Sequence, residues 1–273
     1  EAEAFYGSYA SLRRNYLLED YLADAADIEL VKSVHVQADH DDADPVAETL
    51  WLQGIADAPG SGGFPHAIVA FADLASKNVE QVLEGHLRYA NVRGIRQMLN
   101  YSSDTRLTYT SRNLLEDPGW TKGFGLLAKY NLSFDLQLYA GQMSQAAALA
   151  QRHPDTVLVL DHTGMPVERD EPGLAAWRAG MRELANCRNV SVKISGLGMC
   201  EPAWTELSIR PFVLSVIDWF GPERCMFGSN FPVDSLFSSF ESVFEAFDNI
   251  TKEFSDSERS ALFHDNAERI YRL

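Results

Sequence analysis

The stretch Cys225–Asp234, CMFGSNFPVD, is the clearest indication of the fold. A short apolar run of strand character ends at Gly-Ser-Asn and then turns at Phe231-Pro232. A buried strand that ends in this way delivers a polar side chain, here Asn230, to the rim of a sheet. Similar short apolar runs, each followed by a polar turn, recur along the chain. The candidate strands are Val31–Gln37, His66–Ala72, Val92–Met98, Leu132–Leu138, Thr156–Asp161, Val190–Ser195 and Arg224–Ser229.

Helical patterns separate these strands. Pro45–Ile55 has proline at its start, and Ala175–Ala185 carries apolar residues at three-to-four spacing. The segment Ser257–Tyr271 closes the chain with a serine cap and with Glu258 in its first turn. The other predicted helices are Tyr9–Tyr16, Glu19–Ala26, Asn78–Tyr89, Gly141–Gln151 and Leu207–Phe220.

Strand–helix alternation without a break in composition predicts one α/β domain, in which helices cover a parallel sheet. Seven strand–helix units favour a distorted TIM-type (β/α) barrel over an open doubly wound sheet, and no GxGxxG follows an early strand. A complete barrel of this type has eight strands, so the pattern predicts a barrel that lacks its first strand. We assign residues 5–273 to this domain. The first four residues, EAEA, resemble the remnant of a yeast secretion leader, and we expect them to come from secreted recombinant expression.

Composition narrows the range of partners. With 23 Lys+Arg against 39 Asp+Glu the net charge is −16, which argues against a nucleic-acid or anionic-membrane partner because both need a basic face. No apolar run approaches the roughly 18–20 residues of a membrane span. The three cysteines, Cys187, Cys200 and Cys225, show no metal-ligand spacing. We interpret them as structural thiols in a protein of the reducing cytoplasm.

Polar residues at strand ends are the candidate site residues, because chemistry in such a barrel lies where strands end and loops begin. His35 and Gln37 are spaced two apart and are therefore predicted to share one face of the first strand. His162 ends a strand before Thr-Gly, a turn that presents its side chain outward. The remaining candidates are Arg96, Asp135, Gln137, Asp161, Lys193, Asn230 and Asp234.

Several of these residues have two possible roles. His35 either lines the pocket or is a hydrogen-bonded core residue, and Arg96 is either an ion-pair partner or the fork that binds a substrate carboxylate. Gln37, Gln137 and Lys193 fit a pocket or the filling of the barrel. The aspartates between Asp39 and Asp44 are interpreted as a solvated loop, because they lack the glycine and glutamate of a calcium loop.

Taken together, an ordered set of segments resembles the amidohydrolase-related family, in particular its lactonase branch. These segments cover the chain from about residue 8 to its end and are VHVQAD…DPVAETLWLQ, HAIVAFADL, VRGIRQML, FDLQL, VLDHTGMP, VSVKISGL, RCMFGSNFPVD and LFHDNAERIYRL. The resemblance implies a distorted TIM barrel and hydrolysis of a small lactone, often with little dependence on a divalent metal. It also implies that His162 polarises the carbonyl or positions the water, that Arg96 binds substrate, and that His35, Gln37 and Gln137 line the pocket.

The chain departs from the family pattern in two places. The family opens with a strand bearing His-x-His, a motif found nowhere in this chain, and it usually has aspartate where Asn230 stands. Too few ligands then remain for tight zinc binding, so we expect no metal and no cofactor. An asparagine can hydrogen-bond a substrate or an oxyanion but cannot act as general base, so Asp234 is the candidate base.

We therefore predict a metal-independent hydrolase that opens a small hydroxy- or carboxy-substituted lactone by attack of water on the carbonyl. The predicted site consists of His162, Asn230 and Asp234 for catalysis, with His35, Gln37, Arg96, Gln137 and Lys193 for substrate binding. One alternative is a catalytically silent, truncated barrel that acts as a binding protein or subunit, and another is a decarboxylase of an aromatic acid. Because an incomplete barrel exposes two sheet edges, we expect the N-terminal segment or a second subunit to cover them.

Overall fold

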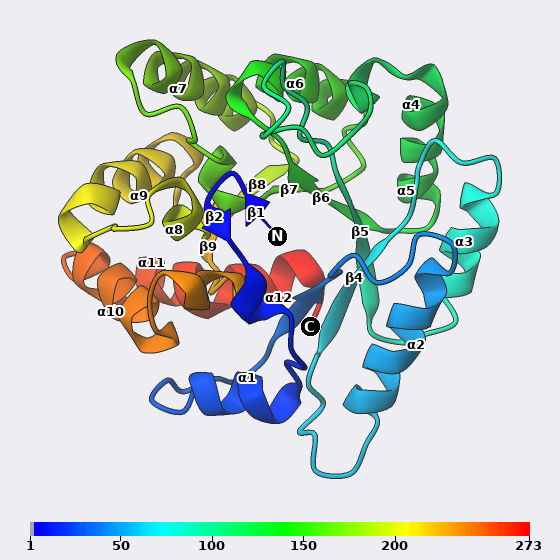
Figure 1. Cartoon of the computed structure of the whole chain (residues 1–273), viewed down its shortest axis with the longest axis horizontal. Helices are drawn as coiled ribbons and strands as arrows, with labels where there is room; N and C mark the ends of the chain where they lie inside the picture. The colour runs from blue at the N-terminus through cyan, green and yellow to red at the C-terminus, as the bar shows by residue number, and fades with distance from the viewer. Residues whose placement is uncertain (1–2) are drawn as a thin grey trace.

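A computed structural model describes residues 3–273 of the chain. Seven parallel strands form one curved sheet in chain order, and helices lie outside it (Figure 1). The strands are β3 (Val34–Val36), β4 (Ala67–Phe71), β5 (Val92–Met98), β6 (Ser133–Gln137), β7 (Leu158–Leu160), β8 (Val190–Ile194) and β9 (Cys225–Phe227). The predicted α/β fold with a parallel, barrel-like sheet is therefore confirmed.

Helices follow the strands in the alternating order that the sequence predicted. The α-helices are α1 (Leu18–Asp24), α2 (Pro45–Ala56), α3 (Val79–His86), α4 (Pro118–Phe124), α5 (Leu126–Lys129), α6 (Met143–Arg152), α7 (Glu171–Ala185), α8 (Leu197–Cys200), α9 (Glu206–Phe220), α10 (Phe240–Thr251), α11 (Asp256–Ser260) and α12 (Asn266–Tyr271). A π-helical turn, Ala261–Asp265, joins α11 to α12.

The two faces of the sheet differ in chemistry. On β6, Phe134 and Leu136 belong to the large apolar cluster formed with the surrounding helices. The residues between and after them, Asp135 and Gln137, face the interior because successive side chains of a strand point to opposite sides. The outer face is thus the main hydrophobic core, and the interior is free to carry polar groups.

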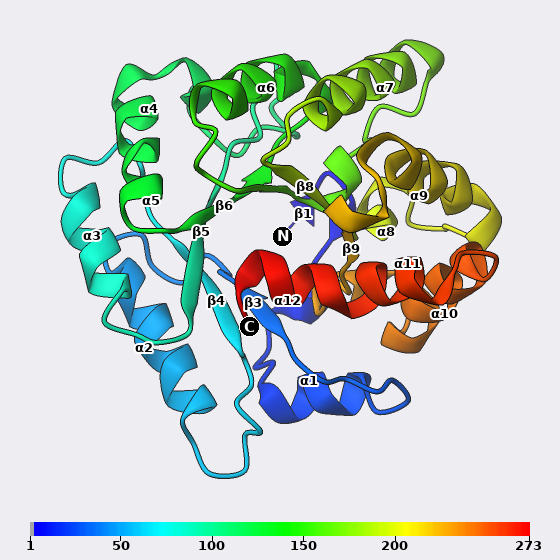
Figure 2. The same cartoon turned by 180° about the vertical axis from the view of Figure 1, so that it is seen from behind.

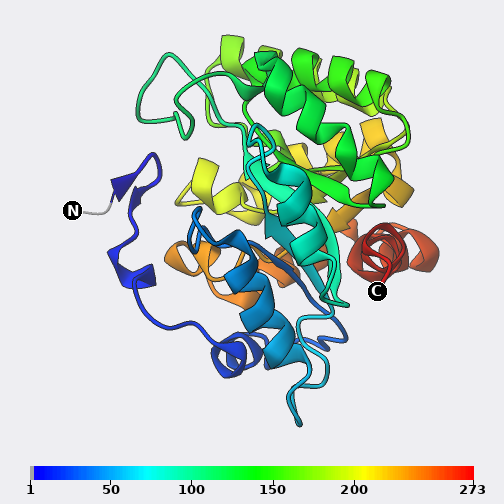
Figure 3. The same ribbon diagram turned by 90° about the vertical axis from the view of Figure 1, so that its right-hand side faces the viewer.

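The C-terminal helix covers one end of the interior. Ile270 and Tyr271 of α12 pack in an apolar cluster with Ala67 and Val69 of β4 and with Met226 of β9. Figure 2 shows α12 crossing the end of the sheet, and Figure 3 shows the N-terminal segment on the opposite side. The N-terminal segment lies over the ends of the strands where candidate site residues are found.

Two helix predictions need correction. Residues 9–16 do not form the predicted helix, since only Ala10–Leu12 makes a turn of 3-10 helix, and that turn has no buried residue to anchor it. The cap of the last helical segment is Ser255 rather than Ser257: its hydroxyl accepts from the Glu258 amide, and the Glu258 carboxylate accepts from the Ser255 amide. A serine followed three residues later by glutamate is the sequence signature of this capping box.

The three cysteines are free thiols, and burial raises the pKa of each. Within residues 3–273, no helix is long and apolar enough to cross a membrane.

The two edge strands, β3 and β9, generate a prediction about assembly. Within the described part of the chain, no ladder of hydrogen bonds joins these strands, so each presents an unpaired edge. Exposed edges invite pairing, and we propose that a second copy of the chain covers them. Light scattering after gel filtration is expected to give the molar mass of a homo-oligomer. Hydrogen exchange is expected to be slow for the amides of β3 and β9. A monodisperse monomer whose β3 and β9 amides exchange rapidly would contradict it.

Candidate active site

A buried lysine joins two carboxylates inside the sheet. Lys193 of β8 places its Nζ 2.9 Å from Oδ2 of Asp135 on β6 and 2.8 Å from Oδ1 of Asp161 after β7. The Tyr271 hydroxyl of α12 donates to the same Asp135 oxygen at 2.8 Å. Both aspartates are fully buried, so these contacts replace the water that the charges would otherwise need.

The charges of this network are mutually dependent. Burial opposes ionisation of Lys193, but the two carboxylates outweigh it and raise the lysine pKa. Burial would likewise raise the pKa of Asp161, yet Lys193 and then His162 and Arg96 hold it below its usual value. For Asp135 burial prevails and the pKa is raised. Lys193 is therefore an ammonium at neutral pH and is bound to protein carboxylates.

Arg96 of β5 ties three strand ends together. Its Nη1 donates to Gln137 Oε1 at 3.1 Å, and its Nη2 donates to the Gln37 carbonyl at 2.5 Å. The Arg96 Nε and the Gln37 Nε2 are buried without a hydrogen-bond partner. Because an unpaired buried donor is costly, these two groups are sites where a substrate oxygen would gain most.

His35 lies away from this interior. It pairs with Ile68 in the β3–β4 ladder, on the face of the sheet that packs against the helices. Its Nε2 is 3.1 Å from Oε1 of Glu48 on α2. His35 therefore points toward α2, while the Gln37 amide donates to the Val69 carbonyl at 2.8 Å just beyond the end of β3, and a shared pocket for the two residues stays a prediction.

His162 lies at the end of β7, buried and with 8% of its surface exposed. Its Nδ1 is 3.2 Å from the Ser195 hydroxyl. Burial lowers the pKa of His162 to about 4; Asp161 opposes this shift, and Lys193 and Arg96 reinforce it. The imidazole is therefore neutral at physiological pH, so it can donate or accept one hydrogen bond toward a substrate.

Asn230 and Asp234 form a turn after β9. Asn230 has a left-handed backbone with φ 55°, and its Nδ2 donates to Asp234 Oδ1 at 2.9 Å. The Asp234 carboxyl is buried beside Leu197 and Trp204 in a small, largely apolar cavity. Burial raises the Asp234 pKa to about 7, although the bond from Asn230 opposes the shift. The turn thus brings the Asp234 carboxyl to the Asn230 amide, and the role of Asp234 as a base stays a prediction.

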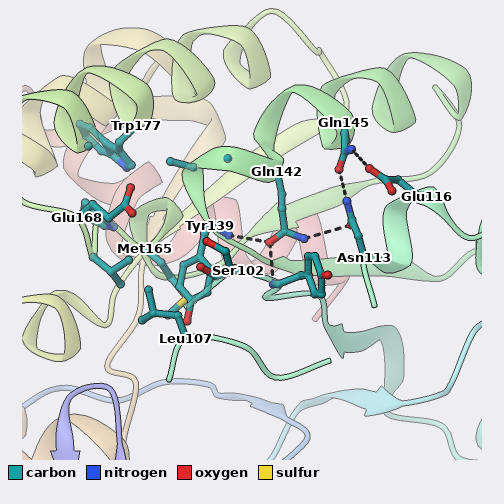
Figure 4. Close-up of a pocket in the computed structure, with 17 residues that line it drawn as sticks. Ser102, Leu107, Asn113, Glu116, Tyr139, Gln142, Gln145, Met165, Glu168 and Trp177 are labelled. Atoms are coloured by element: carbon teal, nitrogen blue, oxygen red, sulfur yellow. Dashed lines mark hydrogen bonds between the residues drawn. The ribbon is translucent and has the colours of Figure 1, made fainter. Parts of the chain in front are cut away.

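A second cavity, which we call the side cavity, is polar and adjoins the strand ends, as Figure 4 shows. It has a volume of about 380 Å³ and lies between the loop after β5 and helices α6 and α7. Amide, hydroxyl and carboxylate groups line much of it. These polar lining residues are Ser102, Ser103, Asn113, Glu116, Tyr139, Gln142, Gln145 and Glu168. Its lining contains no lysine, arginine or histidine.

The family model described as amidohydrolase matches residues 2–273. The chain belongs to the amidohydrolase family. An uncharacterised protein of Sinorhizobium fredii is 48% identical over 270 residues, which cover 98% of this chain and 89% of that protein. An L-fucono-1,5-lactonase of Burkholderia multivorans is 33% identical over 220 residues, which cover 76% of this chain and 71% of that enzyme. The predicted resemblance to the lactonase branch and the prediction of a hydrolase are confirmed.

A solved structure supports the same assignment. An amidohydrolase from Burkholderia multivorans, crystallised with bound zinc, is 29% identical and has a TM-score of 0.83 over 96% of this chain and 90% of that one. The similarity extends over nearly the whole domain of the amidohydrolase described here.

The structure adds site residues that the sequence patterns did not single out. Tyr139 lies just beyond the end of β6 and lines the side cavity, and its buried hydroxyl has no hydrogen-bond partner. The same holds for Oδ1 of buried Asn100, beyond the end of β5. Each of these residues lies two positions beyond the end of its strand, and that nearness to a strand end was the signal that could have found them.

The lysine network generates a stability prediction. Lys193→Met leaves two buried carboxylates without their cation, which is expected to cost about 3–5 kcal/mol in free energy of unfolding. Protonation of Asp135 and Asp161 then removes their buried negative charge. The loss of unfolding free energy should therefore be smaller at pH 5 than at pH 8. Urea denaturation at both pH values measures it.

A matched control is Lys129→Met, which removes an exposed lysine that contacts Glu80 on the surface. This variant should change stability little, since exposed ion pairs contribute little. Equal, small losses for both variants would show that Lys193 does not neutralise the buried aspartates.

Proposed function

We propose that this amidohydrolase opens a small hydroxyl-bearing lactone by attack of water on its carbonyl, without a divalent metal. The names of the L-fucono-1,5-lactonase relatives support the lactone class. The observation that carries the proposal is the set of buried, unpartnered polar groups on Arg96, Gln37 and Tyr139 near the strand ends. They are suited to the oxygens of a lactone and its substituents.

The side chains present do not fit a tightly held zinc ion. Among residues 3–273, no group of three or more His, Cys, Asp or Glu lies together in a way that could hold a metal. Asp135 and Asp161 already contact the Lys193 ammonium, and Asn230 is a neutral residue and a weak ligand. Zinc sites need three or four nitrogen, sulfur or carboxylate ligands, so the mechanism is derived from the protein groups alone.

The proposed mechanism divides the chemistry between neutral and ionisable groups. Neutral His162 hydrogen-bonds the lactone carbonyl, and Arg96 Nε adds a cationic donor for a substrate oxygen. Asn230 directs its Nδ2 to Asp234, which leaves its Oδ1 free to hold the attacking water. The water gives its proton to ionised Asp234, its oxygen bonds to the carbonyl carbon, and the ring C–O bond breaks. The released alkoxide takes up the proton that Asp234 received, which restores the ionised carboxylate, and the product is a hydroxy acid.

The side cavity favours hydroxyl over carboxyl substituents. Glu116 and Glu168 are among its lining residues and would repel an anionic group, whereas Gln145 and Asn113 are neutral hydrogen-bonding residues. Arg96 remains the group that would meet one negative charge, and two of its nitrogens are already engaged by protein oxygens. We therefore place neutral sugar lactones before dicarboxylated lactones as substrates.

We also propose that the interval between β9 and β3 is the position of the first strand that the barrel lacks. In a closed barrel β9 and β3 would flank this position. In the seven-stranded sheet of the described chain they are not paired with each other. Slow exchange of their amides in a monomeric protein would contradict both this proposal and the pairing of copies.

Removal of metal tests the reaction itself. Protein treated with EDTA and checked for residual metal is expected to release acid from at least one member of a panel of sugar, muconic and pyrone lactones. His162→Asn should lower this turnover about 100-fold or more. Activity that returns only with added zinc would overturn metal independence. Folded protein without turnover on any lactone would instead favour a catalytically silent barrel.

The base is tested by Asp234→Asn. Since only ionised Asp234 accepts a proton, kcat/KM should rise with pH through about 7 and then level off. In Asp234→Asn the rise should disappear and kcat should fall about 100-fold or more, while the melting temperature stays equal or increases because burial already disfavours the charge. Asp218→Asn, an exposed change on α9, is the control. Full activity in Asp234→Asn would remove this residue as base.

A further inference from the structure

The backbone that carries His162 is strained. His162, Thr163, Gly164 and Met165 all have left-handed φ values, of 52°, 57°, 67° and 46°. Three of these four residues are not glycine, and the left-handed conformation costs such residues roughly 1–2 kcal/mol each. Residues of this kind normally occur singly, so a run of them persists only where the surroundings enforce it.

Hydrogen bonds from two neighbouring elements hold this left-handed turn. The Trp177 indole Nε1 of α7 donates to the Thr163 carbonyl at 2.9 Å. The Thr163 hydroxyl donates to the Ser195 carbonyl at 3.2 Å and accepts from the Ser195 amide at 3.3 Å. Within the turn, Gly164 N bonds the Asp161 carbonyl and Met165 N bonds the His162 carbonyl. The turn is thus anchored both to β8 and to α7.

The turn determines where His162 points. Asp161 faces the interior and contacts Lys193, so a regular strand would send the next side chain to the opposite face, among the helices. The left-handed backbone instead brings His162 beside Ser195, on the same side as Asp161. Gly196 leaves room for the ring, since a Cβ there would lie 2.7 Å from His162 Nδ1. Two consecutive residues therefore serve one site.

We infer that Trp177 is a positioning residue, whose indole N–H holds the left-handed turn that directs His162 toward the substrate. This inference rests on the proposed function, in which His162 contacts the lactone carbonyl. Trp177 itself is 97% buried, with 3% of its surface exposed, and it packs against Phe212 and Trp219. Its indole is thus fixed by neighbouring helices before it meets the turn.

The test replaces Trp177 by phenylalanine, which keeps an aromatic ring and removes the N–H. With the lactone that the wild type hydrolyses, kcat is expected to fall about 10- to 100-fold with KM within about twofold, because a small misplacement of a reacting group has effects of this size. Trp219→Phe is the matched control: its ring centroid lies 5.5 Å from that of Trp177, and it should keep the wild-type kcat. A raised KM with unchanged kcat would overturn the inference and assign Trp177 to the wall of the side cavity.

A second readout needs no substrate and separates this inference from the proposed function. In protein with ¹⁵N-labelled histidine, the ring signals of His162, assigned by their absence from His162→Asn, should shift in Trp177→Phe and not in Trp219→Phe. Unchanged His162 signals in folded Trp177→Phe would overturn the inference, whether or not any lactone is hydrolysed. If Trp177→Phe does not fold, Thr163→Val is the second variant, because it removes both hydrogen bonds to Ser195. It should produce the same shift of the His162 signals and the same loss of kcat. Wild-type values for both measurements would overturn the inference.

Discussion

The ammonium of Lys193, held between Asp135 and Asp161, is the contact on which the interior of the sheet depends. Two carboxylates and a lysine are removed from water there, a burial that is tolerated only when partners replace the lost hydration. The Tyr271 hydroxyl of α12 donates a further hydrogen bond to Asp135, so the helix that closes one end of the interior also contacts a charge inside it. The apolar contacts of Ile270 with β4 and β9 then fix that helix in place.

This network also sets the electrostatics of the strand ends. Burial lowers the pKa of His162 and keeps it neutral; Asp161 opposes this shift, and the positive charges of Lys193 and Arg96 reinforce it. Asp234 lies against an apolar wall and has its pKa moved the other way, to about 7. The surroundings therefore give the two residues different protonation behaviour: the histidine stays neutral and the carboxyl titrates near neutrality. Such a difference is what an acid–base pair requires.

The sequence patterns predicted the seven strands and most helices because each strand is a short apolar run bounded by turn residues. They also identified Arg96, Gln137 and Lys193, which lie within strands where alternation holds, and Asn230, which lies in the turn after β9. His35 points toward α2 rather than into the interior, a direction that its spacing of two from Gln37 does not reveal. No sequence pattern singled out Trp177. It is one of the regularly spaced apolar residues of α7, and this spacing alone indicates a core residue rather than a contact with the turn that carries His162.

The neutral amide of Asn230 suits its place beside a buried acid. A carboxylate at this place would stand beside the buried carboxyl of Asp234, and two such groups in an apolar setting cannot both ionise easily. The amide removes that conflict and donates to Asp234, so the acidic group lies four residues further along and is held by a hydrogen bond. The left-handed backbone at Asn230, which asparagine tolerates better than most residues, turns the chain so that the two side chains meet. The amide and the turn therefore belong to one arrangement, in which a neutral residue holds a buried carboxyl group by a hydrogen bond.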